Sequence, residues 1–214
     1  MSQESYVFLF PLFGISLVLL IFGIYHPFLI ILFLSLLFFL FSLFIIYFFR
    51  DPERIAPSGD DLILSAADGK VITIKPVDDF VYIGKEGTMI SIFMSVLDVH
   101  VNRIPISGSV GYIKYHKGKF LPAFQDKASL ENEQMEIGLE TDFGRIILKQ
   151  IAGIIARRIV CKVKAGDLVK TGQRFGMIKF GSRIDIFLPK NAEIKVKLNQ
   201  KVKAGETILG VFKK

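Results

Sequence analysis

An uninterrupted apolar stretch fills most of the first quarter of the chain. Residues 6–49 are almost all Phe, Leu, Ile, Val and Tyr, with no Asp, Glu, Lys or Arg among them. One helix of this length would rise about 66 Å, roughly twice the thickness of the hydrocarbon layer of a bilayer. Pro27 disfavours helical geometry at His26, near the midpoint, so the pattern predicts two membrane-spanning helices over 6–25 and 28–49. A single span followed by an interfacial or re-entrant segment is the alternative.

Beyond residue 50 the pattern changes to short runs of alternating apolar and polar residues. A linker with Pro and Gly residues, RDPERIAPSGDD (50–61), comes first. Periodicity of 3.6 residues is absent apart from a short helix expected over 127–133. We therefore expect a membrane hairpin over 1–50 and a mostly-β domain over 51–214. Strands are expected within LILSAADGKVITI (62–74), TMISIFMS (88–95), GSVGYIKYH (108–116), MEIGLET (135–141) and GRIILKQIAG (144–153).

The last third of the chain contains a weak internal repeat. KVKAGDLVKTGQRFGMI (162–178) and KVKAGETILGVF (201–212) each combine a strand, an Ala-Gly-acidic turn and a second strand. Such repeats occur in the interlocking halves of lipoyl- and biotin-carrier-like domains, so we expect a compact β-sandwich or barrel with a lipoyl-like half-barrel repeat. No strand-GxGxxG-helix unit is present, so the glycines of the repeat are interpreted as turn residues with positive φ. They are Gly166, Gly172, Gly176, Gly205 and Gly210.

A further alternating segment, MIKFGSRIDIFLP (177–189), is interrupted by Gly181-Ser182. Apolar and polar residues alternate on both sides of this pair, as in a β-strand. A glycine weakens the interior of a strand and adds no packing. The residues themselves therefore indicate a β-bulge or a tight turn at this point.

The charge distribution indicates a location for the β domain. The chain has 27 Lys and Arg against 20 Asp and Glu, a net charge of +7, and this whole excess lies after residue 50. Arg50 and Arg54 follow the apolar stretch, so the positive-inside rule places the domain on the cytoplasmic face of the cell membrane. The segment MSQES carries no positive charge and the apolar run is long, so we expect no cleaved signal peptide. The single cysteine, Cys161, excludes an intramolecular disulfide framework.

Few side chains beyond residue 50 indicate chemistry by themselves. His100 and His116 have no partner at metal-ligand spacing, so we expect no metal site. His116 is interpreted as a solvated turn residue, and His100 as a hydrogen-bonded residue at the end of a strand. Asp68, in AADGKV, has the sequence context of a turn. The tripeptide DKA (126–128) is similar to a lipoyl-lysine attachment motif but lacks the symmetric strand–turn–strand context.

Taken together and in order, these segments resemble one family. RDPER after an apolar hairpin, SAADGKV, DVHVNRIP, GKFLPAFQDKASLENEQ and a late Gly-Ser occur in the order found in phosphatidylserine decarboxylase proenzymes. The short prokaryotic type is the most similar, and the resemblance covers essentially the whole chain. Its most specific parts are KAS-x-x-NE (127–133) and the Gly-Ser pair.

The resemblance implies self-cleavage between Gly181 and Ser182. The serine hydroxyl would attack the glycine carbonyl, and elimination with loss of ammonia would leave a covalent pyruvoyl group derived from Ser182. The large chain (1–181) and the small chain (182–214) would remain associated. The pyruvoyl group would form a Schiff base with phosphatidylserine in the membrane, and decarboxylation would give phosphatidylethanolamine and CO₂ in phospholipid biosynthesis.

The residues that act in the family are matched unevenly here. Asp68 matches an aspartate that orients a histidine, and His100 matches the first histidine of a D-x-H-x-x-H-x-P pattern. The second histidine is Arg103 here, and an arginine, with a pKa above about 12, cannot act as a general base. By this resemblance His100 is the expected proton donor in decarboxylation, while self-cleavage relies either on His100 or on strain and oxyanion stabilisation. Arg103 is expected to bind the substrate phosphate or carboxylate, and Asn132 and Glu133 to line the lipid pocket.

Other interpretations stay open on the sequence alone. Archaeal relatives are thought to act on archaetidylserine, which has the same head group on ether-linked chains. A non-enzymatic, membrane-anchored carrier or adaptor built on the lipoyl-like repeat would keep an intact chain. A nucleic-acid-binding domain rests only on the basic composition and leaves the apolar hairpin unexplained. The oligomeric state is open, a homo-oligomer included.

Overall fold

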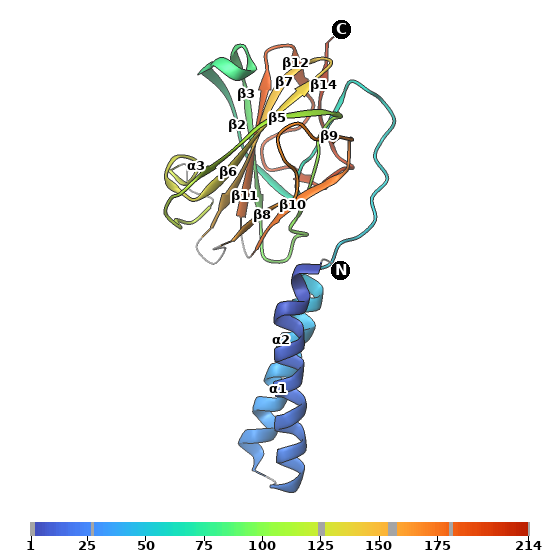
Figure 1. Ribbon diagram of the computed structural model, residues 1–214, viewed down its shortest axis with the longest axis vertical. Coiled ribbons are helices and arrows are strands. Elements are labelled where there is room, and N and C mark those ends of the chain that lie inside the picture. The colour runs from blue at the N-terminus through green and yellow to red at the C-terminus, as the bar shows by residue number, and fades with distance from the viewer. Residues whose placement is uncertain (1–2, 27, 124–126, 154–157, 180–181, 214) are drawn as a thin grey trace. The chain divides into compact units, whose positions relative to one another are not determined.

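The computed structural model of the protein describes residues 3–26, 28–123, 127–153, 158–179 and 182–213. Contacts along the backbone divide the chain into two compact units, Met1–Pro52 and Glu53–Lys214. The first unit is helical and the second is mostly β, which confirms the expected fold class (Figure 1).

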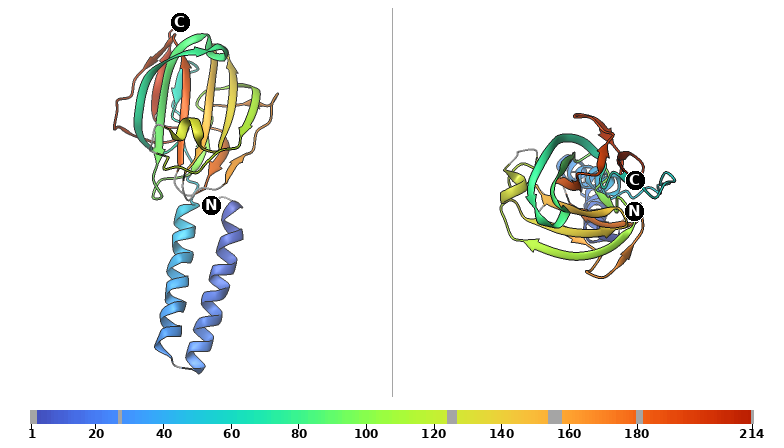
Figure 2. Two further views of the ribbon diagram at one scale, coloured as in Figure 1. Left: turned by 90° about the vertical axis from the view of Figure 1, so that its left-hand side faces the viewer. Right: turned by 90° about the horizontal axis from the view of Figure 1, so that it is seen from above.

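Two apolar helices make up the first unit. After a short 3₁₀ helix, η1 (Gln3–Ser5), α1 (Tyr6–Tyr25) and α2 (Leu29–Phe48) lie side by side (Figure 2). Their bounds are within one residue of the predicted ones. The Ser16 hydroxyl donates to the carbonyl oxygen of Ser35 at 3.0 Å, and the Ser35 hydroxyl donates to the Ser16 carbonyl at 2.9 Å. Such hydrogen bonds join helices in apolar surroundings. Each helix has 20 residues and is apolar enough to cross a membrane.

Within the described residues, the second unit contains one large antiparallel sheet and two small ones. The large sheet has eight strands and is strongly curled (Figures 1 and 2). In spatial order these are β13 (Lys201–Val202), β2 (Gly69–Phe80), β3 (Lys85–Met94), β11 (Ser182–Pro189), β7 (Gly144–Ala152), β6 (Gln134–Thr141), β5 (Gly108–His116) and β9 (Leu168–Val169). The small sheets are β4 (Val101–Arg103), β10 (Arg174–Ile178) and β8 (Ile159–Cys161), and β1 (Leu62–Leu64), β14 (Ile208–Phe212) and β12 (Ala192–Ile194).

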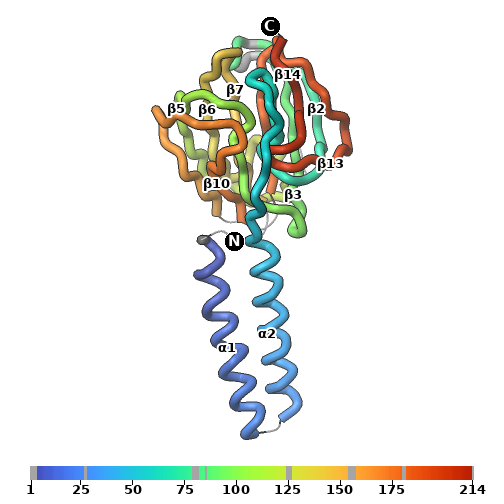
Figure 3. Tube along the Cα trace, turned by 90° about the vertical axis from the view of Figure 1, so that its right-hand side faces the viewer, coloured from blue at the N-terminus to red at the C-terminus, as the bar shows by residue number. Residues whose placement is uncertain are grey.

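In the described part of the second unit there are also two short helical elements. They are η2 (Val81–Ile83), between β2 and β3, and α3 (Ala128–Glu131), within the segment where a short helix was predicted. The linker that starts at Glu53 runs along the β unit to β1 (Figure 3). It is fastened near its end, where the backbone nitrogen of Phe212 donates to the carbonyl oxygen of Asp61 at 3.0 Å.

The strand β11 lies in the middle of the large sheet, between β3 and β7. All of its residues, Ser182–Pro189, are buried. Ile184 points into the main hydrophobic core, on what we call the inner face, whereas Phe187 belongs to a smaller cluster on the outer face. Because side chains alternate along a strand, Arg183 and Asp185 share the outer face with Phe187, and Ser182 shares the inner face with Ile184.

The single strand predicted over 177–189 is in fact two strands. β10 ends at Ile178 and belongs to a small sheet, whereas β11 starts at Ser182 and belongs to the large sheet. The chain therefore changes sheets between these two residues. Gly181, where a bulge or tight turn was expected, lies outside the described residues, as does Asp126 of the DKA tripeptide.

The glycines of the internal repeat have two different roles. Gly166, Gly172 and Gly205 have positive φ, as predicted for turns. Gly176 and Gly210 do not, and the prediction for them was wrong: they lie inside β10 and β14. A Cβ atom at Gly176 would come within 2.3 Å of the carbonyl oxygen of Val160 on the neighbouring strand. Close approach of two backbones, and not a turn, requires glycine at this position.

Candidate active site

Ser182 is the first residue of β11 and is fully buried. It pairs with Met94 on β3 and with Ala152 on β7, so it has backbone neighbours on both sides. Its Oγ atom lies 3.3 Å from the sulfur atom of Met94. A thioether is a weak hydrogen-bond acceptor, so this contact restrains the hydroxyl only weakly. The fold thus places a buried hydroxyl at the point where the chain enters the large sheet.

Two buried amides continue the polar cluster from Ser182 into the core. Asn102, on β4, has its Nδ2 atom 3.7 Å from the same Met94 sulfur. Gln150, on β7, donates from Nε2 to the Oδ1 atom of Asn102 at 2.8 Å. Among the described residues, the Oε1 atom of Gln150 is buried without a hydrogen-bond partner. An unsatisfied buried acceptor lowers the free energy of unfolding by about 1–3 kcal/mol. The cluster is therefore explained better by a chemical role than by a contribution to stability.

Sequence reasoning missed these two amides. Asn102 lies inside the DVHVNRIP motif, two residues after His100. Gln150 occupies an inward-facing position of an apolar strand, two residues after Leu148, where a polar side chain is unusual. A polar residue at a position where the alternation predicts an apolar one was the only signal for Gln150 in the sequence.

His100 is fully buried and directly precedes β4. Its Nδ1 atom lies 2.9 Å from the carbonyl oxygen of Asp98. A carbonyl can only accept, so Nδ1 carries the proton in the neutral ring and Nε2 is the basic nitrogen. The carbonyl oxygen of His100 accepts from the backbone nitrogen of Ile178 at 3.4 Å. Ile178 is four residues from Ser182, at most about 14 Å along the chain, so the topology brings His100 to the same end of the domain.

Asp68 lies in the turn between β1 and β2 and is largely buried. Its Oδ2 atom accepts from Nη2 of Arg54 at 2.8 Å, and its Oδ1 atom accepts from the backbone nitrogen of Ala204 at 2.8 Å. Arg54 also pairs with Glu206 at 3.0 Å. Burial raises the pKa of Asp68, against the lowering effects of the Ala204 and Arg54 contacts, and the charge of Asp98 raises it further. Arg54, from the RDPER motif, is a third residue whose role the sequence did not indicate.

Arg103 lies on β4 with its side chain on the opposite face of the strand from Asn102. Its Nη1 atom donates to the carbonyl oxygen of Gly172 at 3.0 Å. A Cβ atom at Gly205 would lie 3.0 Å from Cδ of Arg103. These contacts are with the turns of the internal repeat. The structure brings together Ser182, Asn102 and Gln150. The contacts described for Arg103 do not include any of these three residues.

Asn132 and Glu133 hold the segment before β6 against β7. The side chain of Asn132 accepts from the backbone nitrogen of Leu121 at 2.9 Å and donates to the carbonyl oxygens of Leu121 and Ala152, both at 2.8 Å. The carbonyl oxygen of Glu133 accepts from the backbone nitrogen of Ala152 at 2.9 Å. Since Ala152 pairs with Ser182, both residues support one neighbour of the serine.

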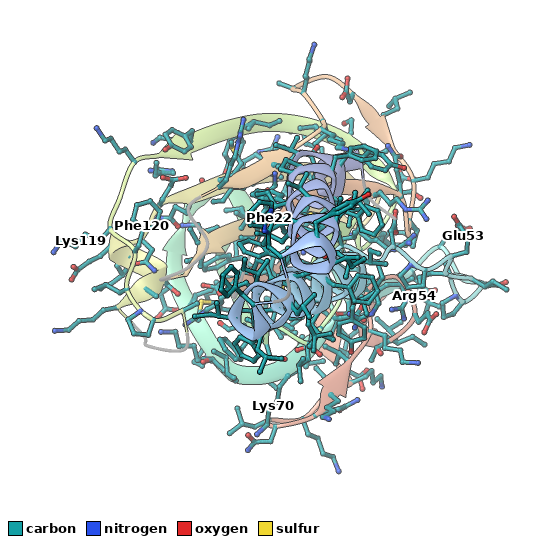
Figure 4. All side chains as sticks on the ribbon, turned by 90° about the horizontal axis from the view of Figure 1, so that it is seen from below. Phe22, Glu53, Arg54, Lys70, Lys119 and Phe120 are labelled. Carbon is teal, nitrogen blue, oxygen red and sulfur yellow. The ribbon has the colours of Figure 1, made fainter. Side chains whose placement is uncertain are left out.

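The segment before Leu121 and the linker lie on different sides of the β unit. Figure 4 shows Lys119 and Phe120 on one side and Glu53 and Arg54 on the other. The first pair precedes the loop that Asn132 fastens to β7, and the second pair includes the partner of Asp68. The end of the unit that contains Ser182 is thus supported by two segments distant in sequence.

A pocket of about 260 Å³ opens on the outer face of the large sheet. It is lined by Lys75, Val77, Met89, Lys127, Ser129, Leu130, Lys149 and Phe187. The inner-face side chain of Ser182 lies on the other side of the sheet, and neither Asn132 nor Glu133 lines this pocket. It is therefore separate from the polar cluster at Ser182.

Comparison with known proteins gives a consistent result. A family model described as phosphatidylserine decarboxylase matches residues 41–210, which include every site residue discussed above. The phosphatidylserine decarboxylase proenzyme of Chlorobaculum tepidum is 52% identical over 170 residues, 79% of this chain and 78% of the relative. The proenzyme of Geobacter metallireducens is 44% identical over 212 residues, 99% of this chain and 96% of the relative. That of Chlorobium limicola is 46% identical over 170 residues, 79% of this chain and 80% of the relative.

Proposed function

The chain belongs to the phosphatidylserine decarboxylase family, and from this premise we propose that it converts phosphatidylserine to phosphatidylethanolamine and CO₂ with a pyruvoyl group derived from Ser182. One observation carries the proposal: the residue that would become the pyruvoyl group is a fully buried serine at the point where the chain passes from β10 to β11. Among the described residues its hydroxyl contacts a thioether, which is a weak acceptor, and a reactive role accounts for its buried position.

The proposed maturation uses the hydroxyl of Ser182 as the nucleophile. Its Oγ atom attacks the carbonyl carbon of Gly181, and the nitrogen of Ser182 leaves that carbon, so the amide becomes an ester. Removal of the Cα proton of residue 182 then expels Gly181 as a carboxylate. One water replaces the nitrogen of residue 182, which leaves as ammonia. The products are a large chain that ends at Gly181 and a small chain that begins with the pyruvoyl group on Arg183.

The residues around Ser182 fit such a group. A pyruvoyl carbonyl at this position supplies an electrophile for the amine of a serine head group and accepts electrons as CO₂ leaves. The Nδ2 atom of Asn102, whose described contact is the Met94 sulfur, is available to donate to a substrate or carbonyl oxygen. The Oε1 atom of Gln150, which has no hydrogen-bond partner within the described part of the chain, is an acceptor suited to an ammonium group. Burial of both amides in the core excludes water and strengthens these interactions.

We assign proton transfer to His100. Its Nδ1–H is held by the carbonyl of Asp98, which fixes the ring, and Nε2 is the basic nitrogen that would give or take the proton. Histidine is the side chain whose charge changes most readily near neutral pH. Asp68 holds Arg54 and the turn at Ala204, so we assign it the support of this end of the domain. Arg103, Asn132 and Glu133 are proposed as positioning residues, since their described contacts fix turns and loops around the site.

The apolar helices suit a lipid substrate. We propose that α1 and α2 anchor the chain in the cell membrane, with the β unit on the cytoplasmic face. A tethered enzyme meets a substrate in the same bilayer at a high effective concentration. The excess of Lys and Arg after residue 50 favours an anionic membrane surface, by about 1 kcal/mol for each basic residue near it. Membership of the family argues against the non-enzymatic carrier, and the relatives' names favour phosphatidylserine over archaetidylserine.

Substitution of Ser182 by alanine tests the proposal. Wild type, Ser182→Ala and Ser58→Ala would be purified in detergent, examined on denaturing gels, and assayed for CO₂ release from phosphatidylserine in mixed micelles. Ser58 is an exposed linker serine and serves as the matched control. We expect wild type and Ser58→Ala to be cut and active, and Ser182→Ala to be intact and inactive. Release of CO₂ by Ser182→Ala would refute the assignment.

A further inference from the structure

A buried ion pair follows Ser182 on the outer face of β11. The Nε atom of Arg183 donates to Oδ1 of Asp185 at 2.6 Å, and the two side chains are 1% and 0% exposed. Taking two charges out of water is costly, and apolar residues of similar volume often serve stability as well or better. The pair therefore calls for an explanation other than stability.

The ion pair is completed by two serines from elsewhere in the chain. The Nη2 atom of Arg183 donates to the hydroxyl of Ser91 on β3 at 2.7 Å. The Ser129 hydroxyl on α3 donates to the Oδ2 atom of Asp185 at 2.7 Å. Arg183 thus makes contact at two points of its planar fork, which fixes the guanidinium group more firmly than one contact would. Both oxygens of Asp185 are likewise engaged.

The proposed cleavage site separates the members of this cluster. Arg183 and Asp185 lie in the small chain, whereas Ser91 and Ser129 lie in the large chain. Before cleavage, the start of β11 is held covalently through the preceding residues. After cleavage, residue 182 would be a chain terminus, and termini lose order unless they are tied down. The cluster provides such a tie at Arg183, the residue next to the new terminus.

We infer that Arg183 and Asp185, with Ser91 and Ser129, form a clamp that positions the reactive terminus of the small chain after self-cleavage. This inference rests on the proposed function. Arg183 and Asp185 lie on the outer face while the group made from Ser182 faces the core, so the clamp acts through the backbone of β11 and touches neither the substrate nor the carbonyl. It also gives a physical role to Ser129, the serine of the KAS motif.

The clamp should matter for turnover much more than for cleavage. A displacement of about 1 Å at a reacting group can lower a rate about a hundredfold. In Ser129→Ala the Asp185 carboxylate loses one bond, and in Arg183→Lys the positive charge stays but the two-point contact is lost. For both variants we expect cut chains that stay associated, a KM within about twofold of wild type, and a kcat at least tenfold lower.

The experiment compares these variants with wild type and with Ser107→Ala. Ser107 forms a hydrogen bond with Thr171 at an exposed site, so its substitution is the matched control. Cleavage is followed on denaturing gels, association by size exclusion in detergent, and the number of reactive carbonyls by labelling with a hydrazine. Turnover is then expressed as kcat per reactive carbonyl. A smaller amount of folded or cleaved protein therefore does not lower the kcat that is compared.

Hydrogen exchange supplies a second readout that separates positioning from ordinary stability. In the uncut Ser182→Ala background, adding Ser129→Ala should change amide exchange in residues 183–189 by less than about threefold, because the chain upstream still holds the strand. In the cleaved protein, Ser129→Ala should accelerate exchange in the same peptide at least tenfold. Equal acceleration in both backgrounds would overturn the clamp.

The outcomes distinguish this inference from the proposed function. An uncut wild-type chain would contradict the proposed function itself. A cut wild type with Ser129→Ala and Arg183→Lys at normal kcat per carbonyl would overturn the clamp alone. If Arg183→Lys does not fold, Ser129→Ala decides the question, since it deletes one hydroxyl from a half-buried helix residue.

Discussion

The Nη2 atom of Arg54 donates to the Oδ2 atom of Asp68 across 2.8 Å. This bond fastens the linker after the apolar helices to the turn that starts β2. Asp68 also accepts a hydrogen bond from the backbone nitrogen of Ala204, in the second copy of the internal repeat. Arg54 and Asp68 are 14 residues apart, so their motifs RDPER and ADGKV form one structural element.

Removal of Arg54 should destabilise the β unit. Arg54→Met leaves the Asp68 carboxylate largely buried without its cation, and breaking such a pair lowers the free energy of unfolding by about 2–3 kcal/mol after allowance for partial exposure. Chemical unfolding in detergent, followed by circular dichroism, measures the change. The double variant Arg54→Met/Asp68→Asn should lose less than the sum of the two single variants. Strict additivity would show that the pair is not coupled.

The same carboxyl predicts a pH dependence of stability. Burial raises the pKa of Asp68 despite its contacts with Ala204 and Arg54. Between the ordinary value of about 3.9 and the raised value, the folded chain binds more protons than the unfolded chain, so this group makes the free energy of unfolding fall as pH rises. The difference in that free energy between wild type and Asp68→Asn should therefore shrink across this window. A difference that grows with pH would mean that Arg54 lowers the pKa of Asp68 overall.

Loss of His100 should affect turnover more than maturation. His100→Ala should still be cut, at least in part, but its kcat should fall by about 10²–10⁴, the usual contribution of a positioned acid or base. His116→Ala is the matched control: His116 is the last residue of β5 and not the solvated turn residue expected from the sequence, and its Nε2 atom lies 3.9 Å from Oε2 of Glu136. Gel analysis and CO₂ release report the two steps separately. Normal turnover in a fully cut His100→Ala protein would remove the proposed role.

Gln150 should be more important for activity than for stability. Gln150→Met removes a hydrogen bond to Asn102 but also removes the Oε1 atom, a buried acceptor without a partner among the described residues. The two effects on the free energy of unfolding should therefore cancel to within about 1 kcal/mol. The kcat/KM for phosphatidylserine should fall at least tenfold, because the acceptor proposed for the substrate ammonium is absent. An unchanged kcat/KM would exclude Gln150 from substrate recognition.

The local pattern of apolar and polar residues was enough to predict most of the elements named below. The helices of the hairpin and the strands β3, β5, β6 and β7 follow the predicted segments closely, because apolar periodicity is a property of neighbouring residues. The segment 177–189 was different. Its alternation continues through two strands, and nothing in a local pattern says that each half joins a different sheet. For the same reason Gly176 was assigned to a turn, whereas the need for glycine comes from Val160 on another strand.

The candidate site divides in a similar way. Ser182, His100 and Asp68 could be named because ordered motifs identified them. The contacts that surround them could not: Gln150 and Asn102 are 48 residues apart, and Ser129 and Asp185 are 56 apart. A sequence shows that such polar residues exist, but only the folded chain shows which of them meet.

The central claim is that Ser182 becomes a ketone at the start of a new chain, and mass spectrometry of the active preparation tests this most directly. We predict a small chain of residues 182–214 whose first residue has lost its amine and has a carbonyl that borohydride reduces with the addition of two hydrogens. A parallel sample of Ser182→Ala should contain only the intact chain. An active preparation with the intact chain alone, or with a small chain that begins with an ordinary serine amine, would contradict the account.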